Sequence, residues 1–181
     1  EVFISKMRKL KGIRKMILIE EAWKAIAREG MAEYIKYLFK TVRKFFGEAI
    51  VVTQEVEDII SSPVVKQAII NNSDCKILLD QSKYQNKFDQ IQELLGLTEK
   101  EKAQVLSINK ANDPGKKYKE VFISLGGMLS KVYRVEVSAE EYLAYTTEET
   151  EKFKVMQLAE QFNGNIEKAI THYLNNKNQV L

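Results

Sequence analysis

The stretch Lys15-Met-Ile-Leu-Ile-Glu-Glu-Ala-Trp-Lys24 decides how the rest of the chain is interpreted. Residues 15–19 form an aliphatic run of the length of a strand, and this pattern predicts a strand that is buried on both faces of a parallel sheet. Two adjacent acids, Glu20 and Glu21, follow directly. The sequence therefore predicts two carboxylates at the carboxyl end of a buried strand, where ligands of open α/β sheets gather.

A hydrophobic strand that ends in two acids and a small residue has the form of a Walker B motif. Phosphoryl transfer to water uses one carboxylate in the Mg²⁺ shell and, in many ATPases, a second carboxylate to polarise the attacking water. Glu20 and Glu21 suit these two roles because the chain turns at the end of the strand. The alternative is a helix start, where acids lie near the positive end of the helix dipole.

A second strand predicted at residues 48–53 ends in Thr53 and is followed by Gln54. A third predicted strand, at residues 75–79, is followed by Asp80 and Gln81. Because the carboxyl ends of parallel strands meet at one edge of a sheet, we expect these polar residues to converge with the two acids. A neutral amide such as that of Gln54 can orient a γ-phosphate or its water without adding charge. The alternative role for Gln54 is to solvate a helix start.

Arg43 lies near the end of a helix predicted at residues 32–46, before the second strand. It need not reach the same site within one subunit. An arginine in this position could act as a finger into the nucleotide of a neighbouring subunit, where it would neutralise charge that develops in the transition state. The alternative is a cation that stabilises the carboxyl end of its own helix.

The order of the predicted elements indicates an α/β domain with mostly parallel strands, flanked by helices. Residues 118–124 and 131–137 pair as an antiparallel hairpin across Gly126-Gly127. Ser138-Ala-Glu-Glu141 has the form of a capping box, and Thr147 is a second candidate N-cap, so helices follow the hairpin. We expect residues 1–137 to form the α/β part and residues 138–181 a helical extension packed on it.

The composition of the 181-residue chain excludes several kinds of site. One cysteine and one histidine exclude an internal disulfide and a cysteine-based zinc site, and they leave little for a Ser-His-Asp triad. Residues 1–47 hold 12 Lys and Arg against 5 Asp and Glu, although the net charge of the whole chain is only +3. This basic first quarter could face the phosphates of a nucleotide or of DNA, or it could be a solvated helix face.

Taken together, these motifs resemble a known family. Residues 15–24, the stretch Thr41-Val-Arg-Lys-Phe-Phe-Gly47, the stretch Ala49-Ile-Val-Val-Thr-Gln54 and residues 71–81 look like the TraG-type conjugative-transposon ATPases of type IV secretion systems. The hairpin at residues 116–137 is similar to the last sheet strands of that family. The resemblance covers essentially the whole chain.

The resemblance implies a RecA-like P-loop NTPase that hydrolyses ATP to drive DNA or protein transfer or pilus assembly. It implies a hexamer at the inner face of the bacterial cytoplasmic membrane, with other conjugation components as partners and DNA as a candidate partner. Glu20 would hold Mg²⁺, directly or through a water, with Thr53 beside the nucleotide. Glu21 would be the catalytic glutamate, Gln54 the phosphate sensor and Arg43 the finger.

Two departures from the family matter. Relatives more often have aspartate at the position of Glu20, and no Gly-x-x-x-x-Gly-Lys-Ser/Thr occurs in the chain. We therefore expect the C-terminal part of a motor domain that lacks the Walker A strand and loop, is inactive alone and binds neither Mg²⁺ nor ATP by itself. The bared edge of residues 49–53 would favour dimerisation of such a fragment. The alternative is a non-catalytic module with a degenerate NTPase fold that binds DNA or a partner.

Overall fold

The computed structural model describes residues 2–22, 24, 29–54, 69–110 and 118–177. The chain divides into two compact units, Glu1–Ile108 with Phe122–Val132, and Asn109–Val121 with Tyr133–Leu181. The predicted helices near residues 22–29 and 55–71 fall largely outside the described residues. In chain order, the described elements are α1 (Val2–Lys9), β1 (Lys15–Ile19), α3 (Glu29–Thr41), η1 (Val42–Phe45), β2 (Gly47–Val51), β3 (Cys75–Leu78), η2 (Ser82–Lys87), α6 (Phe88–Leu95), α7 (Glu99–Ser107), β4 (Tyr118–Leu125), β5 (Leu129–Glu136), α8 (Ala139–Tyr145), α9 (Glu149–Gln161) and α10 (Ile166–Lys177).

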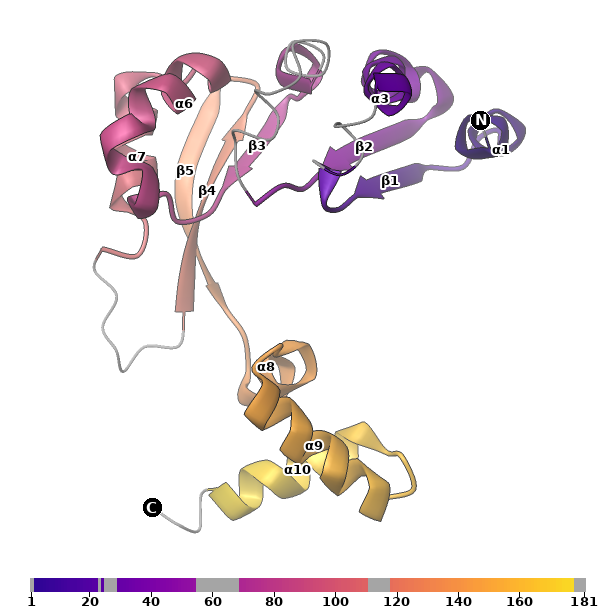
Figure 1. Cartoon of the computed structure of the whole chain (residues 1–181), viewed down its shortest axis with the longest axis vertical. Helices are drawn as coiled ribbons and strands as arrows, with labels where there is room; N and C mark the ends of the chain where they lie inside the picture. The colour runs from indigo at the N-terminus through magenta and orange to yellow at the C-terminus, as the bar shows by residue number, and fades with distance from the viewer. Residues whose placement is uncertain (1, 23, 25–28, 55–68, 111–117, 178–181) are drawn as a thin grey trace. The chain divides into compact units, whose positions relative to one another are not determined.

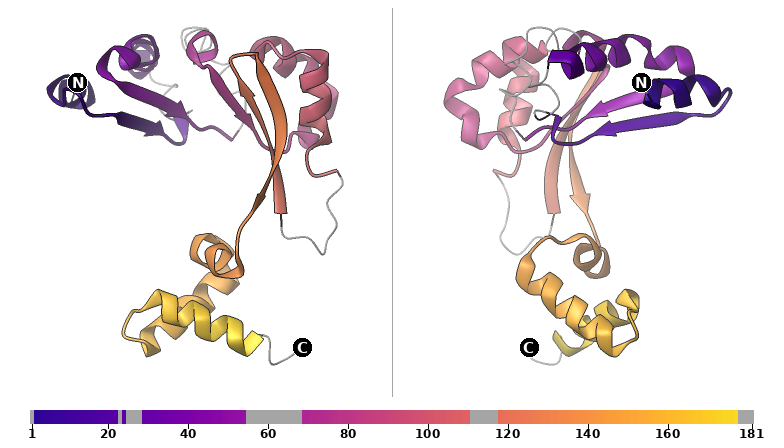
Figure 2. Two further views of the ribbon diagram at one scale, coloured as in Figure 1. Left: turned by 180° about the vertical axis from the view of Figure 1, so that it is seen from behind. Right: turned by 45° about the vertical axis from the view of Figure 1, so that its right-hand side comes forward.

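β1 and β2 form a two-stranded parallel sheet, as the sequence predicts. The register places Lys15 opposite Gly47 and Ile19 opposite Val51. α3 lies across one face of this sheet (Figures 1 and 2), because its apolar residues recur every three or four positions and so form one stripe. That stripe and α1 bury the inner face in two adjoining clusters, built on Ala22, Ala32, Ile35, Phe39 and Ile69 and on Met7, Leu38 and Val42.

The prediction that β1 and β2 are buried on both faces is wrong for the residues that the structure describes. Alternate residues of both strands are half-buried and exposed. Met16 and Leu18 are 62% and 53% exposed, and Ile50 is 36% exposed. A continuous aliphatic run does not reveal how many faces are covered, so sequence alone could not distinguish one covered face from two.

β3, β4 and β5 form a separate three-stranded sheet. β4 and β5 are joined through the predicted turn at Gly126-Gly127. β3 pairs antiparallel with β4, with Ile77 opposite Ile123, so the expectation of a third parallel strand is wrong. The sheet that was expected to be mostly parallel contains one parallel pair among the described strands. A four-residue apolar strand carries no signal for the direction of its partner, which explains the error.

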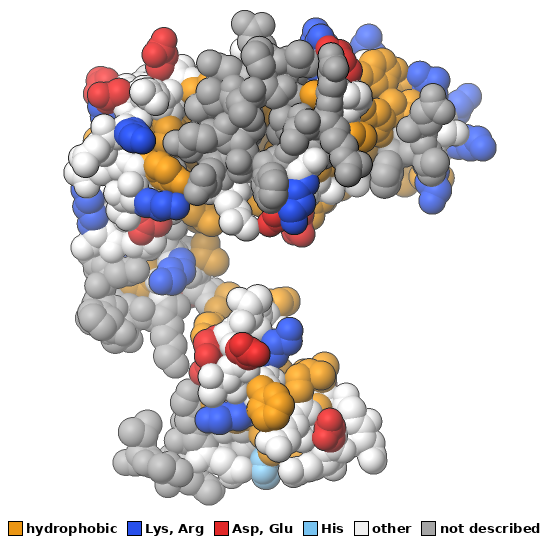
Figure 3. All heavy atoms as spheres, in the orientation of Figure 1, with side chains coloured by type: hydrophobic (Ala, Val, Ile, Leu, Met, Phe, Trp, Pro, Cys, Tyr) orange, Lys and Arg blue, Asp and Glu red, His pale blue; other side chains and the backbone are white. Residues whose placement is uncertain are grey.

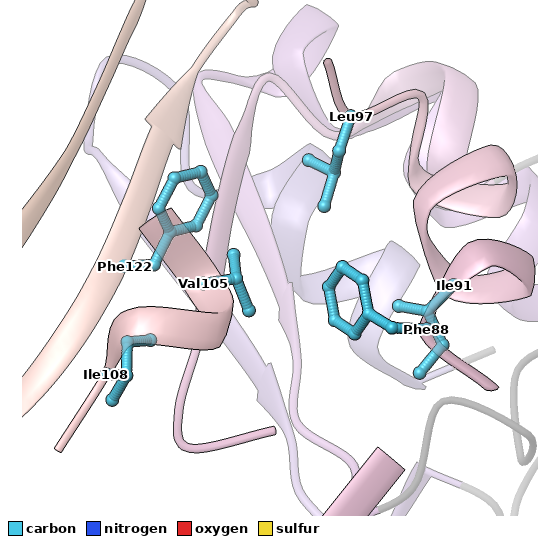
Figure 4. Close-up of a cluster of buried hydrophobic side chains, with 6 residues drawn as sticks. All are labelled: Phe88, Ile91, Leu97, Val105, Ile108 and Phe122. Carbon is cyan, nitrogen blue, oxygen red and sulfur yellow. The ribbon is translucent and has the colours of Figure 1, made fainter. Parts of the chain in front are cut away.

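α6 and α7 cover one face of this second sheet (Figure 4). Phe88 and Ile91 reach the cluster from α6, and Phe122 reaches it from β4. Phe88 and Phe122 are fully buried, and each such ring contributes about 1.5–3 kcal/mol by leaving water. The complete set of buried side chains in the cluster is Phe88, Ile91, Leu97, Val105, Ile108 and Phe122.

A buried carboxylate joins the start of α7 to β4. Thr98 and Glu101 form the predicted capping box, in which the Thr98 N–H donates to the Glu101 carboxylate at 2.9 Å. The Ser124 hydroxyl donates to the other Glu101 oxygen at 3.1 Å. Burial opposes ionisation of Glu101, but hydrogen bonds from Thr98, Ser124 and Ser130 outweigh it and lower the pKa of this carboxyl group.

The Glu101 network predicts a pH-dependent stability. Because the folded-state pKa lies below that of the unfolded chain, Glu101 stabilises the fold fully above about pH 4.3, and this stabilisation is lost as the pH falls through the folded-state pKa. We expect Glu101→Gln to lower the free energy of unfolding at pH 7 by about 1–3 kcal/mol. The difference between variant and wild type should shrink below about pH 4. Urea unfolding from pH 3 to 8 measures both, with exposed Glu99→Gln as the control; an equal loss at every pH would contradict the assignment.

The helices α8, α9 and α10 form a small core of their own in the second unit (Figure 2). Ser138 caps α8 through the predicted capping box with Glu141. α9 begins one residue later than the Thr147 cap would give, because the Glu148 side chain accepts from the N–H groups of Thr150 and Glu151. The predicted boundary between residues 137 and 138 remains a prediction, while the turn half of the hairpin belongs to the first compact unit and its open half to the second.

Candidate functional site

The carboxyl ends of β1 and β2 stay paired beyond the strands themselves. The Val52 N–H donates to the Ile19 carbonyl at 2.9 Å, and the Ala22 N–H donates to the Val52 carbonyl at 3.3 Å. Ala22 is fully buried beneath α3, so a small side chain is needed where the chain leaves the sheet. These contacts fix the backbone of the two acids against the end of β2.

Gln54 meets Glu21 across this end of the sheet. The Gln54 Nε2 group donates to Glu21 Oε1 at 3.0 Å. Lys24 Nζ lies 3.4 Å from the other carboxylate oxygen, Oε2. The structure therefore brings together two of the three residues that the sequence predicts to be catalytic, and it adds a cation that sequence reasoning did not single out. The signal for Lys24 was its spacing, three residues after the acid.

The backbone of Glu21 is unusual. Its φ angle is +51°, in the left-handed region that non-glycine residues seldom occupy. Such conformations cost about 1–3 kcal/mol and persist where the surrounding structure imposes them. Here the conformation turns the carboxylate towards Gln54 directly after the strand. Strained residues cluster at functional sites, so this observation supports a functional interpretation of Glu21.

Glu20 and Thr53 occupy the same end of the sheet. Glu20 is exposed and Thr53 is half-buried. Among the described residues, no group of three or more His, Cys, Asp or Glu side chains could hold a metal ion. Mg²⁺ is usually bound by one or two carboxylates together with waters and substrate phosphates, so a single carboxylate fits an ion that arrives with a nucleotide. The donor set therefore fits Mg²⁺ bound with phosphates and does not fit a site built by side chains alone.

Arg43 lies at the opposite end of the sheet from these residues. It is exposed in η1, immediately before β2 begins, whereas Gln54 follows the end of β2. The five residues of β2 separate the two by about 16 Å at a rise of about 3.3 Å per residue. An arginine side chain does not span this distance, so Arg43 does not join Glu21 and Gln54 within one chain.

Asp80 and Gln81 also do not join the site through a common sheet. They follow β3, which pairs with β4 and not with β2. Asp80 instead accepts a hydrogen bond from the Ser82 N–H at 2.8 Å, at the start of η2. The convergence expected at the ends of three parallel strands is therefore limited to β1 and β2 in the described chain.

Comparison with known proteins identifies the family. The model of the TraG P-loop domain matches residues 1–177. The chain belongs to the TraG P-loop domain family. A search of curated proteins found no match. Among solved structures, the fold is similar to that of VirB4 from Thermoanaerobacter pseudethanolicus, with a TM-score of 0.55 and 23% identity over 77% of this chain. The match covers 36% of the VirB4 chain, so this TraG-family chain spans about a third of that protein.

The family assignment confirms the resemblance that the sequence motifs indicate and places the chain among P-loop domains of type IV secretion and conjugation ATPases. The VirB4-like fold combines small parallel and antiparallel sheets with helices, in agreement with the expected α/β class. None of the described helices is both long enough and apolar enough to span a membrane.

Proposed function

We propose that this TraG-family chain carries the acid and sensor half of an ATP-hydrolysing site in a conjugation motor. The observation that supports this proposal is the 3.0 Å hydrogen bond from Gln54 to Glu21 across the ends of β1 and β2. An ATPase needs a carboxylate to polarise water and a neutral group to orient the γ-phosphate, held side by side. The remaining half, with the P-loop, would come from another part of a longer polypeptide.

Each residue at this end of the sheet has a distinct proposed role. Glu21 accepts a proton from the attacking water, and Gln54 orients Glu21 and the water without adding charge. Glu20 would hold Mg²⁺, directly or through a water, and Thr53 would lie beside the phosphates. When bound, the ion neutralises charge on the phosphates. Lys24 stabilises the ionised form of Glu21, because an opposite charge at 3.4 Å favours the carboxylate.

Arg43 is proposed to act in the site of a neighbouring subunit. Its position at the amino end of β2 keeps it away from Glu21 of the same chain. In a homo-hexamer, the amino end of one subunit could approach the nucleotide of the next, where a guanidinium group stabilises transition-state charge. The assembly would lie at the cytoplasmic face of the bacterial membrane and couple hydrolysis to DNA or protein transfer or to pilus assembly.

The 181-residue chain alone should not bind ATP tightly or hydrolyse it. Phosphate recognition in P-loop proteins rests on backbone N–H groups of the glycine-rich loop, and Glu20 and Glu21 repel a polyphosphate in the absence of Mg²⁺. We expect isothermal titration calorimetry with Mg-ATP to show no binding at micromolar concentrations. Micromolar affinity would mean that the described residues build a complete phosphate site and would contradict the division of the site between two segments.

In the full-length protein, Glu21→Gln should permit nucleotide binding but reduce kcat by about a hundredfold or more, the effect of losing a positioned base. The amide keeps the size of the side chain, so the fold should be unaffected. Steady-state hydrolysis and binding of a fluorescent ATP analogue separate the two effects. Glu48→Gln, which neutralises an exposed acid of β2, is the matched control and should leave kcat unchanged. A Glu21→Gln variant with wild-type kcat would rule out the base role.

Arg43→Ala should also spare nucleotide binding and lower kcat, by about 10³-fold or more if the arginine acts as a finger. Mixing Arg43→Ala subunits with Glu21→Gln subunits tests the position of the finger. Some interfaces of a mixed ring combine an intact Arg43 with an intact Glu21, so partial recovery of hydrolysis is expected. Absence of recovery would indicate that Arg43 only stabilises the end of η1. Lys44→Ala, at the adjacent exposed cation, serves as the control.

A further inference from the structure

Phe46 has a conformation that neither packing nor backbone geometry explains. It ends η1 with φ 56° and ψ 43°, in the left-handed region. A bulky side chain is a genuine outlier there. The ring is 55% exposed, so burial does not offset the strain. Strain and exposure together both act against folding, and residues of this kind are found where the side chain has a function.

The neighbouring glycine makes the choice of Phe46 more informative. Helices commonly end at a left-handed glycine, yet here the glycine follows one position later. Gly47 is required by a close approach, because a Cβ atom at this position would lie 2.9 Å from Val42 Cγ2. Glycine or asparagine at position 46 would adopt the observed backbone more easily. The chain instead holds an aromatic ring at this position, directed to solvent.

Cationic side chains surround this ring. The Arg14 guanidinium lies 5.8 Å from the centre of the Phe46 ring, and Arg8 lies 5.8 Å from that of Phe45. Arg8 also donates to the Tyr37 hydroxyl at 3.2 Å, so its position is fixed. Residues 2–19 and 34–47 contain no acidic residue. We call the exposed cations of these two segments, with Tyr37 and Phe46, the basic surface: Lys6, Arg8, Lys9, Lys11, Arg14, Lys40, Arg43 and Lys44.

Packing places the two basic segments together. Met7 of α1 is buried against Leu38 of α3 and Val42 of η1. The cations of α1 and of the α3–η1 segment therefore belong to one surface, and Figure 3 shows Lys and Arg side chains gathered at the α1 end without acidic side chains among them. Because the apolar side of α1 is used in this core, α1 does not have a free apolar face to insert into a membrane.

We propose that the basic surface binds single-stranded nucleic acid, with Phe46 stacking on a base and Arg8, Arg14 and the neighbouring lysines contacting phosphates. Non-specific single-strand sites combine a cationic track with aromatic rings on which bases stack. A duplex hides the faces of its bases, so the exposed ring of Phe46 favours a single strand. The inference does not depend on ATP hydrolysis, so either proposal can fail without the other.

Fluorescence anisotropy of a labelled thirty-nucleotide oligo-dT with the 181-residue chain tests the proposal. We expect binding at low salt, weaker binding to a duplex of the same length, and an affinity that falls as salt rises. Phe46→Asn should weaken binding by about five- to a hundredfold, the range measured for loss of one stacked base. Its melting temperature should equal or exceed that of the wild type, because asparagine tolerates the left-handed region. Phe46→Tyr should retain binding.

Removing phosphate contacts should change the salt dependence in a countable way. Arg8→Gln combined with Arg14→Gln should reduce the slope of log affinity against log salt by about 1.4, at about 0.7 per phosphate on a single strand. The segment Lys152-Phe153-Lys154 on α9 provides the matched control, because its ring is 66% exposed between two exposed lysines. Phe153→Asn, and Lys152→Gln with Lys154→Gln, should leave both affinity and slope unchanged.

Four results would overturn the proposal. One is the absence of oligo-dT binding at low salt, and a second is binding that Phe46→Asn leaves unchanged. A third is a lower melting temperature for Phe46→Asn, which would show that the ring stabilises the fold. The fourth is tighter binding to vesicles of phosphatidylglycerol and phosphatidylcholine than to oligo-dT, because the basic surface would then be a membrane contact.

Discussion

The parallel pairing of β1 with β2 is the interaction on which the candidate site depends. The register that places Ile19 opposite Val51 also brings the residues after both strands together. A slip of one residue would turn the half-buried side chains, such as Ile17 and Ala49, away from α3. The packing of α1 and α3 on the inner face therefore stabilises the register, and the register brings Gln54 to Glu21. Core stability and site geometry are thus set by the same contacts.

Both ends of this sheet hold a residue in the left-handed region, and neither is of the type that tolerates it well. Glu21 has φ +51° at the carboxyl end, and Phe46 has φ +56° at the amino end. Asn109 and Asn163, the other described non-glycine residues with positive φ, are of the type enriched there. At about 1–3 kcal/mol each, the two strained residues cost a noticeable part of the stability of a small domain. Selection for stability alone would not keep glutamate and phenylalanine at these positions.

Local signals in the sequence predict the local structure well. The aliphatic run at residues 15–19, the cap at Thr98 and the turn at Gly126-Gly127 are all found where their chemistry places them. Each depends on residues within a few positions of one another. The two acids and Gln54 are predicted as neighbours because a parallel pair of strands has one carboxyl edge, and the 3.0 Å contact agrees with that reasoning.

Features that depend on distant partners could not be predicted. The direction of β3 depends on β4, more than 40 residues later in the sequence, and nothing within Cys75–Leu78 specifies it. The exposure of Met16 and Leu18 depends on which segments cover the outer face of the sheet. The ion pair of Lys24 with Glu21 depends on the turn that follows β1, a consequence of the backbone conformation of Glu21. Hydrophobic periodicity contains no information on these points.

The opposite charges at the two ends of the β1–β2 sheet bear on how copies of the chain could associate. Glu20 and Glu21 lie at the carboxyl end, and Arg43 lies with the other cations of the basic surface at the amino end. A two-fold contact at either end would bring like charges together, whereas a head-to-tail contact pairs acids with cations and leads to a ring if it closes. One triphosphate needs only a few of the eight cations. The remaining cations of α1 leave room for a second polyanion, so a finger at Arg43 and a nucleic-acid strand near Phe46 need not compete for the same side chains.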